Sequence, residues 1–195
     1  MPSLNSQTDK NFKAVILFHT QTPEKFKEKI KQYKKQYKFF EPLYVDTYNV
    51  DVIRKFIRKI TKNNWILTLR IDNDDAVSTK FVEIMKQNFA PIDKMYLSPA
   101  DGACLEVDNN IAYSYRYKSG HFLGKVEKNN KNFVTVYQKN NNEFMEHTKV
   151  IKLKDFLLIE TPQEPMWLEV IHDSNVSNSA KKQKDNKVPL EIFGL

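Results

Sequence analysis

The sequence predicts an α/β fold, with a mainly parallel sheet, helices on both faces and a smaller layer of antiparallel strands. Two observations carry this prediction. Over the first 90 residues, short apolar runs alternate three times with segments whose apolar residues recur at helical spacing. After Pro91, short β-branched and aromatic runs separated by turn residues take over. Because strands joined through helices run in one direction, the first part favours right-handed crossovers onto a parallel sheet.

The first strand and helix have clear local signals. Ala14–Phe18 is an apolar run bounded by polar residues, which is typical of a buried strand. Thr22-Pro23-Glu24 resembles a helix start, with Thr as the N-cap, Pro in the first position and an acid in the first turn. The helix predicted after it has a lysine-rich face and an apolar face, the latter formed by Phe26, Ile30, Tyr33 and Tyr37.

The later elements follow in order along the chain. Further strand–helix pairs are predicted at Pro42–Asp46 with a helix from Val50 to Ile60, and at Trp65–Ile71 with a helix at Ala76–Asn88. Antiparallel strands are predicted at Met95–Ser98, Ala103–Val107, Ile111–Tyr117 and Phe133–Gln138. A final helix is expected from Pro162 or Glu164 to about His172. We expect one domain over residues 1–172, divided at about residue 90, and a Lys-rich tail at 173–195 with an apolar end.

Composition excludes several classes of protein. The chain has 195 residues, of which 41% are hydrophobic, so it can bury a core and is unlike disordered sequences. No apolar run reaches the roughly 18 residues that a transmembrane helix needs, and Met1–Lys10 is too polar for a secretory signal. Cys104, the single cysteine, has no partner for an internal disulfide. We therefore expect a cytoplasmic protein.

The net charge of +7 comes mainly from lysine, with 27 Lys, 4 Arg and 18 Asn. Proteins that read specific nucleic-acid sequences rely on Arg, because its planar guanidinium makes bidentate contacts that Lys does not. A Lys- and Asn-rich composition is also what an AT-rich coding sequence produces. We therefore expect no specific nucleic-acid partner.

The most informative stretch, Arg70 to Asp75, holds three carboxylates where the third predicted strand ends. In open α/β sheets, ligands bind at this edge. Asp72 and Asp74 point roughly the same way in an extended segment, so both could face one cation. Neighbouring acids repel unless positive charge lies between them, and Mg²⁺ or Mn²⁺ on carboxylates usually adds substrate phosphates to its shell. The cluster indicates a metal–diphosphate substrate; the alternative is that Asp74 or Asp75 caps the helix predicted at Ala76–Asn88.

A second group of candidate residues lies near the C-terminus. His172 could act as a neutral imidazole ligand for the same metal, and Trp167 could stack on a sugar ring. The alternatives are a core position for Trp167 and a surface or capping role for His172. The remaining histidines have no evident partners in the sequence and receive no role; they are His19, His121 and His147.

Together these features resemble a GT-A-type glycosyltransferase, and more closely the rhamnosyltransferase family. The resemblance spans nearly the whole chain, and its C-terminal block is the most specific. Its blocks are Pro2-Ser3-Leu4, Gln7-Thr8, Asn11-Phe12, Val15–Phe18, Thr22-Pro23, Arg70–Ala76, Pro165–Leu168, Val170–His172 and Asn175–Asn178. The resemblance implies a three-layer GT-A-like fold with a nucleotide-binding half at about 1–90 and an acceptor half at about 91–172.

The resemblance also implies a reaction, in which a sugar moves from a nucleotide-diphosphate donor to a glycan or other hydroxyl acceptor. It places Asp72 near the ribose or sugar, and assigns Asp74 as a ligand of Mg²⁺ or Mn²⁺. Asp75 supports that shell or caps a helix, and His172 is a further metal or phosphate contact. The metal neutralises charge on the departing nucleotide. Arg70 orients the acids or contacts the donor.

The remaining site predictions concern the catalytic base and the donor pocket. If the reaction inverts the anomeric carbon, a carboxylate takes the proton of the acceptor hydroxyl. Glu164 and Asp173 are the predicted catalytic residues, and Glu160 and Asp101 are alternatives. The predicted metal ligands are Asp72, Asp74 and His172, and the predicted donor or cofactor contacts are Arg70, Asp72, Asp74, Asp75, Trp167 and Asn175.

This chain departs from the family in one respect, since members carry an additional stretch before the Pro-Ser-Leu block. That stretch supplies a first strand and part of the base pocket. Besides an active transferase with a glycan, lipid-linked or protein-linked acceptor, two alternatives therefore stand. One is a non-catalytic or fragmentary nucleotide-sugar-binding domain. The other is a basic surface protein whose Lys25–Lys38 helix meets an anionic membrane or nucleic acid, and such a peripheral membrane contact can coexist with transfer.

Overall fold

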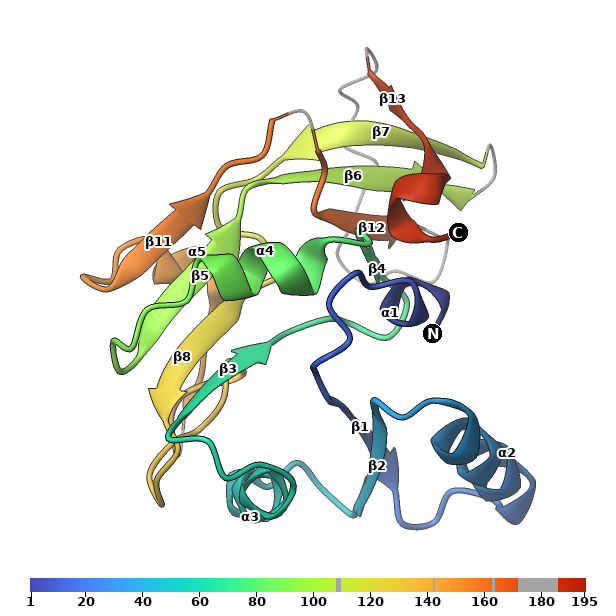
Figure 1. Cartoon of the computed structure of the whole chain (residues 1–195), viewed down its shortest axis with the longest axis vertical. Helices are drawn as coiled ribbons and strands as arrows, with labels where there is room; N and C mark the ends of the chain where they lie inside the picture. Colours follow the sequence, from blue (N-terminus) through green and yellow to red (C-terminus); the bar gives the residue numbers. More distant parts are fainter. Residues whose placement is uncertain (108–109, 142, 163, 172–185) are drawn as a thin grey trace.

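The computed structural model describes residues 1–107, 110–141, 143–162, 164–171 and 186–195 (Figure 1). The α/β class predicted from the sequence is confirmed, with four sheets and several helices. None of the helices in the described part of the chain combines the length and apolar character that a transmembrane span requires.

A small parallel sheet forms from β1 (Ala14–His19) and β2 (Phe40–Val45), which the 13-residue helix α2 (Glu24–Gln36) connects. The apolar face of α2 packs on this sheet, where Ile30 and Phe40 are buried. Helix α3 (Val50–Ile60) follows, and the Asn49 side chain caps it by accepting hydrogen bonds from the first backbone N–H groups.

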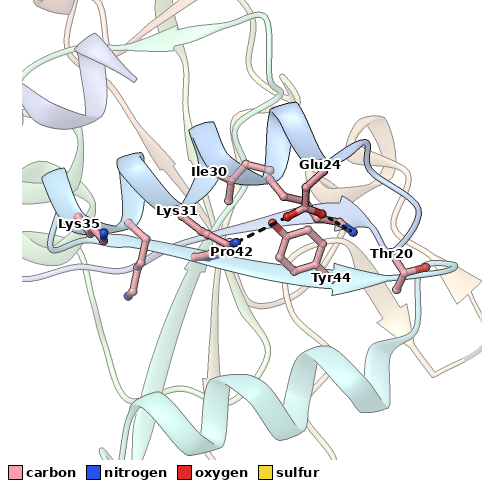
Figure 2. Close-up of a pocket in the computed structure, with 9 residues that line it drawn as sticks. Thr20, Glu24, Ile30, Lys31, Lys35, Pro42 and Tyr44 are labelled. Carbon is pink, nitrogen blue, oxygen red and sulfur yellow. Dashed lines mark ion pairs between the residues drawn. The ribbon is translucent and has the colours of Figure 1, made fainter.

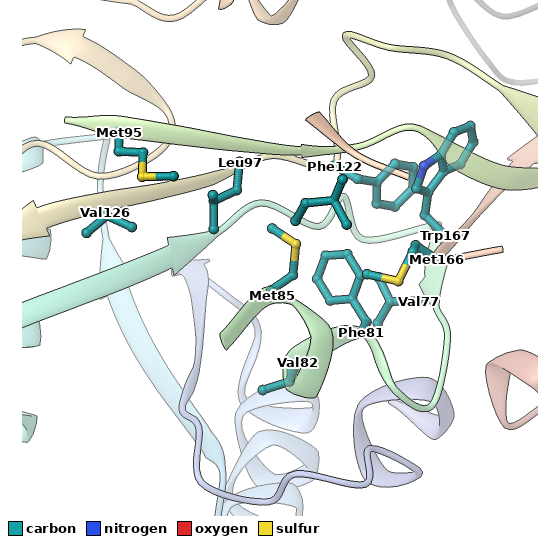
Figure 3. Close-up of a cluster of buried hydrophobic side chains, with 11 residues drawn as sticks. Val77, Phe81, Val82, Met85, Met95, Leu97, Phe122, Val126, Met166 and Trp167 are labelled. Atoms are coloured by element: carbon teal, nitrogen blue, oxygen red, sulfur yellow. The ribbon is translucent and has the colours of Figure 1, made fainter. Parts of the chain in front are cut away.

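A four-stranded mixed sheet has the strand order β11, β5, β8, β3. Strand β8 (Gly124–Lys128) runs antiparallel to β3 (Trp65–Leu69) and to β5 (Met95–Pro99). Strand β11 (Phe156–Ile159) runs parallel to β5. Helix α4 (Phe81–Gln87) covers one face, and its Phe81 and Met85 enter the main apolar core (Figure 3).

A five-stranded sheet completes the framework, in the order β13, β7, β6, β12, β4. Its longer strands are β6 (Asp101–Glu106), β7 (Ile111–Arg116) and β12 (Trp167–Ile171), and its short ones are β4 (Ala76–Val77) and β13 (Lys187–Val188). The remaining elements are short: α1 (Pro2–Asn5), the hairpin of β9 (Gln138–Asn140) and β10 (Glu143–Phe144), α5 (His147–Val150), and the 3-10 helix η2 (Leu190–Phe193). The apolar C-terminal end docks through the buried Phe193.

The prediction of one mainly parallel sheet over the first 90 residues is wrong. Within the described residues, β1 pairs with β2 alone and β3 pairs with β8 alone, in the antiparallel direction. The physical reason is non-local: Leu67 and Leu69 of β3 pack with the main core, which residues from the second half of the chain complete.

Three further elements differ from the sequence prediction. The helix expected at Ala76–Asn88 begins at Phe81, because Ala76 and Val77 pair with β12 instead. The final helix expected up to His172 is strand β12, since its backbone pairs in parallel with β6. Tertiary pairing here overrides the local pattern.

The strand expected at Phe133–Gln138 is also wrong, apart from its last residue. The N–H groups of Val134 and Thr135 donate to the carboxylate of the buried Glu127, at 3.1 and 2.9 Å, instead of to a neighbouring strand. Glu127 in turn pairs with the buried Lys125 at 3.2 Å. A buried ion pair therefore holds this loop against β8.

Candidate metal centre

The acidic cluster lies in the connection between β3 and β4. The Arg70 N–H donates to the Leu123 carbonyl at 2.8 Å, which ties the start of this connection to the chain just before β8. The Arg70 guanidinium forms two hydrogen bonds to Asp72, from Nε to Oδ1 at 3.1 Å and from Nη2 to Oδ2 at 3.0 Å. It also lies over the Tyr137 ring, 5.5 Å from the centroid. This bidentate, stacked arrangement fixes the Asp72 carboxylate.

Asp75 is the most buried acid of the cluster. Its side chain is 6% exposed, against 35% for Asp72. Its Oδ1 accepts a hydrogen bond from the Val170 N–H of β12 at 3.0 Å, and its Oδ2 lies 2.8 Å from His121 Nε2. Asp75 therefore joins three separate parts of the chain.

Asp72, Asp75 and His121 form one group in which the possible ligand atoms all lie within 4.8 Å of one another. Two carboxylates and one imidazole can coordinate Mn²⁺ or Mg²⁺, with water and substrate oxygens completing the coordination shell. Arg70 already balances the charge of Asp72. A second positive charge next to the buried Asp75 is thus compatible with the electrostatics of the group.

A second histidine lies beside this group. The His147 ring is 6.3 Å from the His121 ring, centroid to centroid. His147 Nδ1 is 2.6 Å from the Ser119 carbonyl oxygen, and because a carbonyl only accepts, Nδ1 carries the proton and donates it. That hydrogen bond orients the ring in the way that supporting groups orient histidines near metals.

The structure brings some of the predicted site residues together and separates others. Arg70, Asp72 and Asp75 lie in one place, whereas Asp74 is exposed and outside the group of three possible ligands. Glu164 lies before β12 rather than at a helix start, and it forms an ion pair with Lys80 at 2.8 Å. Three predicted residues lie outside the described part of the chain, namely His172, Asp173 and Asn175.

The sugar-stacking role predicted for Trp167 is wrong, and the core alternative holds. Trp167 is 2% exposed, and its Nε1 donates to the Pro99 carbonyl at 3.0 Å. Phe122 stacks on the indole at 5.1 Å between centroids, and Tyr115 contacts it edge-on at 5.8 Å (Figure 3 shows Phe122 and Trp167). Backbone at Gly102 lies against the ring as well. No face of this indole is left for a ligand.

The alternative bases Asp101 and Glu160 share one cation. Asp101 Oδ1 accepts from Arg116 at 2.5 Å and its Oδ2 accepts from the Thr161 N–H at 2.7 Å. Arg116 also binds the Glu160 carboxylate. Through these contacts Asp101 and Arg116 hold the ends of β6, β7 and β11 together.

His121 is not among the site residues predicted from the sequence, and no local pattern identifies it. It lies 46 residues after Asp75 in the sequence. Antiparallel pairing of β8 with β3 brings the residues just before β8 next to Arg70. This long-range pairing is the only signal, and it exists only in the folded chain.

The environment of Tyr137 predicts a pH effect on stability. Burial, and then the nearby Asp72 carboxylate, raise the pKa of Tyr137 to about 12 from its ordinary value of 10.0. Between these values the unfolded chain releases the phenol proton and the folded chain keeps it, so the free energy of unfolding falls as pH rises. We expect urea unfolding between pH 10 and 12 to show this fall, and Tyr137→Phe to show a shallower one. If the free energy of unfolding fell equally with pH in both proteins, the raised pKa of Tyr137 would be contradicted.

The comparisons with known proteins identify the family of the chain. A family model described as "Putative rhamnosyl transferase" matches residues 1–184, and the chain belongs to this family. The family indicates glycosyltransferase activity, with a sugar donor and an acceptor as partners. A search of the curated proteins found no match.

Proposed function

We propose that this protein is a metal-dependent glycosyltransferase, with Asp72, Asp75 and His121 as the ligands of Mn²⁺ or Mg²⁺. Its substrates are then a nucleotide-diphosphate sugar and a hydroxyl acceptor on a glycan, lipid-linked or protein-linked molecule. The observation that carries the proposal is the group of two carboxylates and one imidazole within 4.8 Å, in a chain of the rhamnosyltransferase family. A cytoplasmic location and a GT-A-type arrangement belong to the same proposal.

The chemistry of the donor set supports a hard divalent cation. Two carboxylates supply oxygen ligands, and His121 supplies a neutral nitrogen when Nε2 is unprotonated. A cation bound here supplies positive charge beside the diphosphate that leaves the sugar. The chain itself positions these groups: Arg70 fixes Asp72, and the Val170 N–H fixes Asp75.

The other predicted residues take supporting roles in the proposal. Asp74, exposed beside Asp75, is a candidate contact of the donor or of metal-bound water. His172, which the family resemblance gives as a metal or phosphate contact, stays in the proposal as a further ligand. Asp173 and Glu164 are the candidates for the base that accepts the proton of the acceptor hydroxyl.

Calorimetric titration tests the proposal directly. We expect one of UDP, GDP and dTDP to bind the purified chain in the presence of Mn²⁺, and EDTA to abolish the binding, because the diphosphate and the carboxylates repel each other without the cation. Equal affinity with EDTA would contradict metal dependence. Failure of all three nucleotides to bind would contradict a donor site in this chain.

Release of free or transferred sugar from the matching nucleotide sugar is the second measurement. Metal-dependent binding together with sugar release supports the transferase. Binding that is never accompanied by release, across a set of hydroxyl acceptors, favours the alternative of a non-catalytic nucleotide-sugar-binding domain.

A further inference from the structure

A groove runs between α2 and β2, far in the sequence from the acidic cluster (Figure 2). Its volume is about 630 Å³. Ile30, Pro42 and Tyr44 supply apolar surface to it, while Thr20 and Glu24 lie at one end. Four lysines of one helix complete the lining: Lys27, Lys31, Lys34 and Lys35.

The lysines outnumber the carboxylates that pair with them. Helix α2 holds six lysines and two glutamates over 13 residues. Glu24 pairs with both Lys27 and Lys31 at 3.6 Å, and Glu41 of β2 pairs with Lys34 at 2.5 Å. Lys13, whose side chain is 46% exposed, forms a second ion pair with Glu41 and contributes a further positive charge. This surface therefore keeps a net positive charge after every internal pair is formed.

An exposed aromatic side chain lies on the same helix. Phe26 is 50% exposed, and the Lys25 ammonium lies 5.0 Å from its ring centroid. Aromatic side chains flanked by lysines are typical of helices that lie in a membrane interface, where the ring enters the headgroup region and the ammonium groups reach phosphates.

Two observations argue against other occupants of this surface. Pro42 stands in the middle of β2 and has no N–H, which disfavours addition of a peptide strand along the groove. All four arginines of the chain lie outside α2, whereas nucleic-acid readers favour the bidentate guanidinium. Adsorption to an anionic bilayer depends on the number of positive charges and accepts lysine equally.

We propose that α2, with its lysine-lined groove and Phe26, docks the protein on a bilayer surface rich in anionic phospholipids. The lysines contact headgroup phosphates, and Phe26 inserts among the headgroups. This inference is independent of the proposed function, because none of these residues belongs to the acidic cluster.

Vesicle sedimentation tests the proposal with the whole chain. We expect binding to vesicles of phosphatidylcholine mixed with phosphatidylserine and none to phosphatidylcholine alone. Replacing Lys27, Lys31, Lys34 and Lys35 by Gln is expected to weaken binding about fivefold per lysine, and so several hundredfold in total. Binding is also expected to fall steeply between about 0.1 M and about 1 M NaCl, as the screening length drops from about 10 Å to about 3 Å. Phe26→Ala is expected to weaken binding further.

A matched variant carries four Lys→Gln changes at exposed sites elsewhere, namely Lys55, Lys59, Lys152 and Lys154. It loses the same charge but is expected to keep vesicle binding within about fivefold of the unmodified chain. Equal losses in the two variants would overturn the proposal, since net charge alone would then explain binding. Equal binding to neutral vesicles would overturn it too, as would tighter binding to duplex DNA than to anionic vesicles. Circular dichroism checks that α2 stays folded in the variants. We expect it to do so, because Gln has a helix propensity close to that of Lys.

Discussion

Asp75→Asn is expected to abolish Mn²⁺-dependent nucleotide binding and to lower sugar transfer by at least about 100-fold. Asparagine has the shape of aspartate and keeps an oxygen that accepts the Val170 N–H, so the fold around β12 is preserved. It loses the negative charge that faces His121 Nε2 and holds a cation. Calorimetry with Mn²⁺ and the nucleotide that binds the unmodified chain measures the effect, which rests on the proposed function.

Asp74→Asn is the matched control for this change. Asp74 is adjacent in sequence and also acidic, but it is exposed and outside the group of three possible ligands. We expect it to reduce metal-dependent binding by less than about tenfold. The resemblance to the family assigns the metal to Asp74, whereas the geometry favours Asp75. A larger loss for Asp74→Asn than for Asp75→Asn would therefore overturn the ligand set proposed here.

Gly102→Ala is expected to lower the free energy of unfolding by about 3 kcal/mol or more, which is more than any other substitution proposed here. A Cβ at this position would lie 2.1 Å from an indole atom of Trp167. The indole has no room to move, because Phe122 stacks on it and its Nε1 bonds to Pro99. Since single domains are stable by only about 5–15 kcal/mol, we expect a large drop in the urea midpoint or failure to fold.

Gly120→Ala serves as the control for this prediction. The nearest atom that a Cβ at Gly120 would meet is Cδ1 of Tyr117 at 3.8 Å, which is an ordinary van der Waals contact. We expect a change in the free energy of unfolding within about 1 kcal/mol. If Gly102→Ala proved as mild as Gly120→Ala, the tight packing of Trp167 against β6 would be refuted.

Local signals determined many of the elements that the structure contains. The apolar run at Ala14–Phe18 forms β1, and α2 begins at Glu24, close to the predicted start. The predicted cap is wrong, however: Pro23 takes the N-cap position, no side chain caps the helix, and the Thr22 hydroxyl donates to the His19 carbonyl instead. The run at Trp65–Ile71 forms β3, and the alternating stretch at Ile111–Tyr117 forms β7. These segments were predictable because the period of the apolar residues depends on a few neighbours in the sequence.

Pairing between distant segments decided the rest. The stretch from Trp167 to Ile171 has apolar residues that suit either a helix or a strand, and its place between β4 and β6 makes it a strand. The same pairing gives Asp75 its Val170 partner and buries Trp167, which the sequence alone offered as a sugar contact.

The sequence by itself determined the acidic cluster at the end of β3 and the family to which the chain belongs. Only the tertiary structure decided which acids gather and which histidine joins them. Asp72 and Asp75 approach His121 because β3 and β8 pair in the antiparallel direction across more than 40 residues of chain. A local pattern specifies an element through its neighbours in sequence, whereas the ligands of a metal are neighbours only in the folded chain.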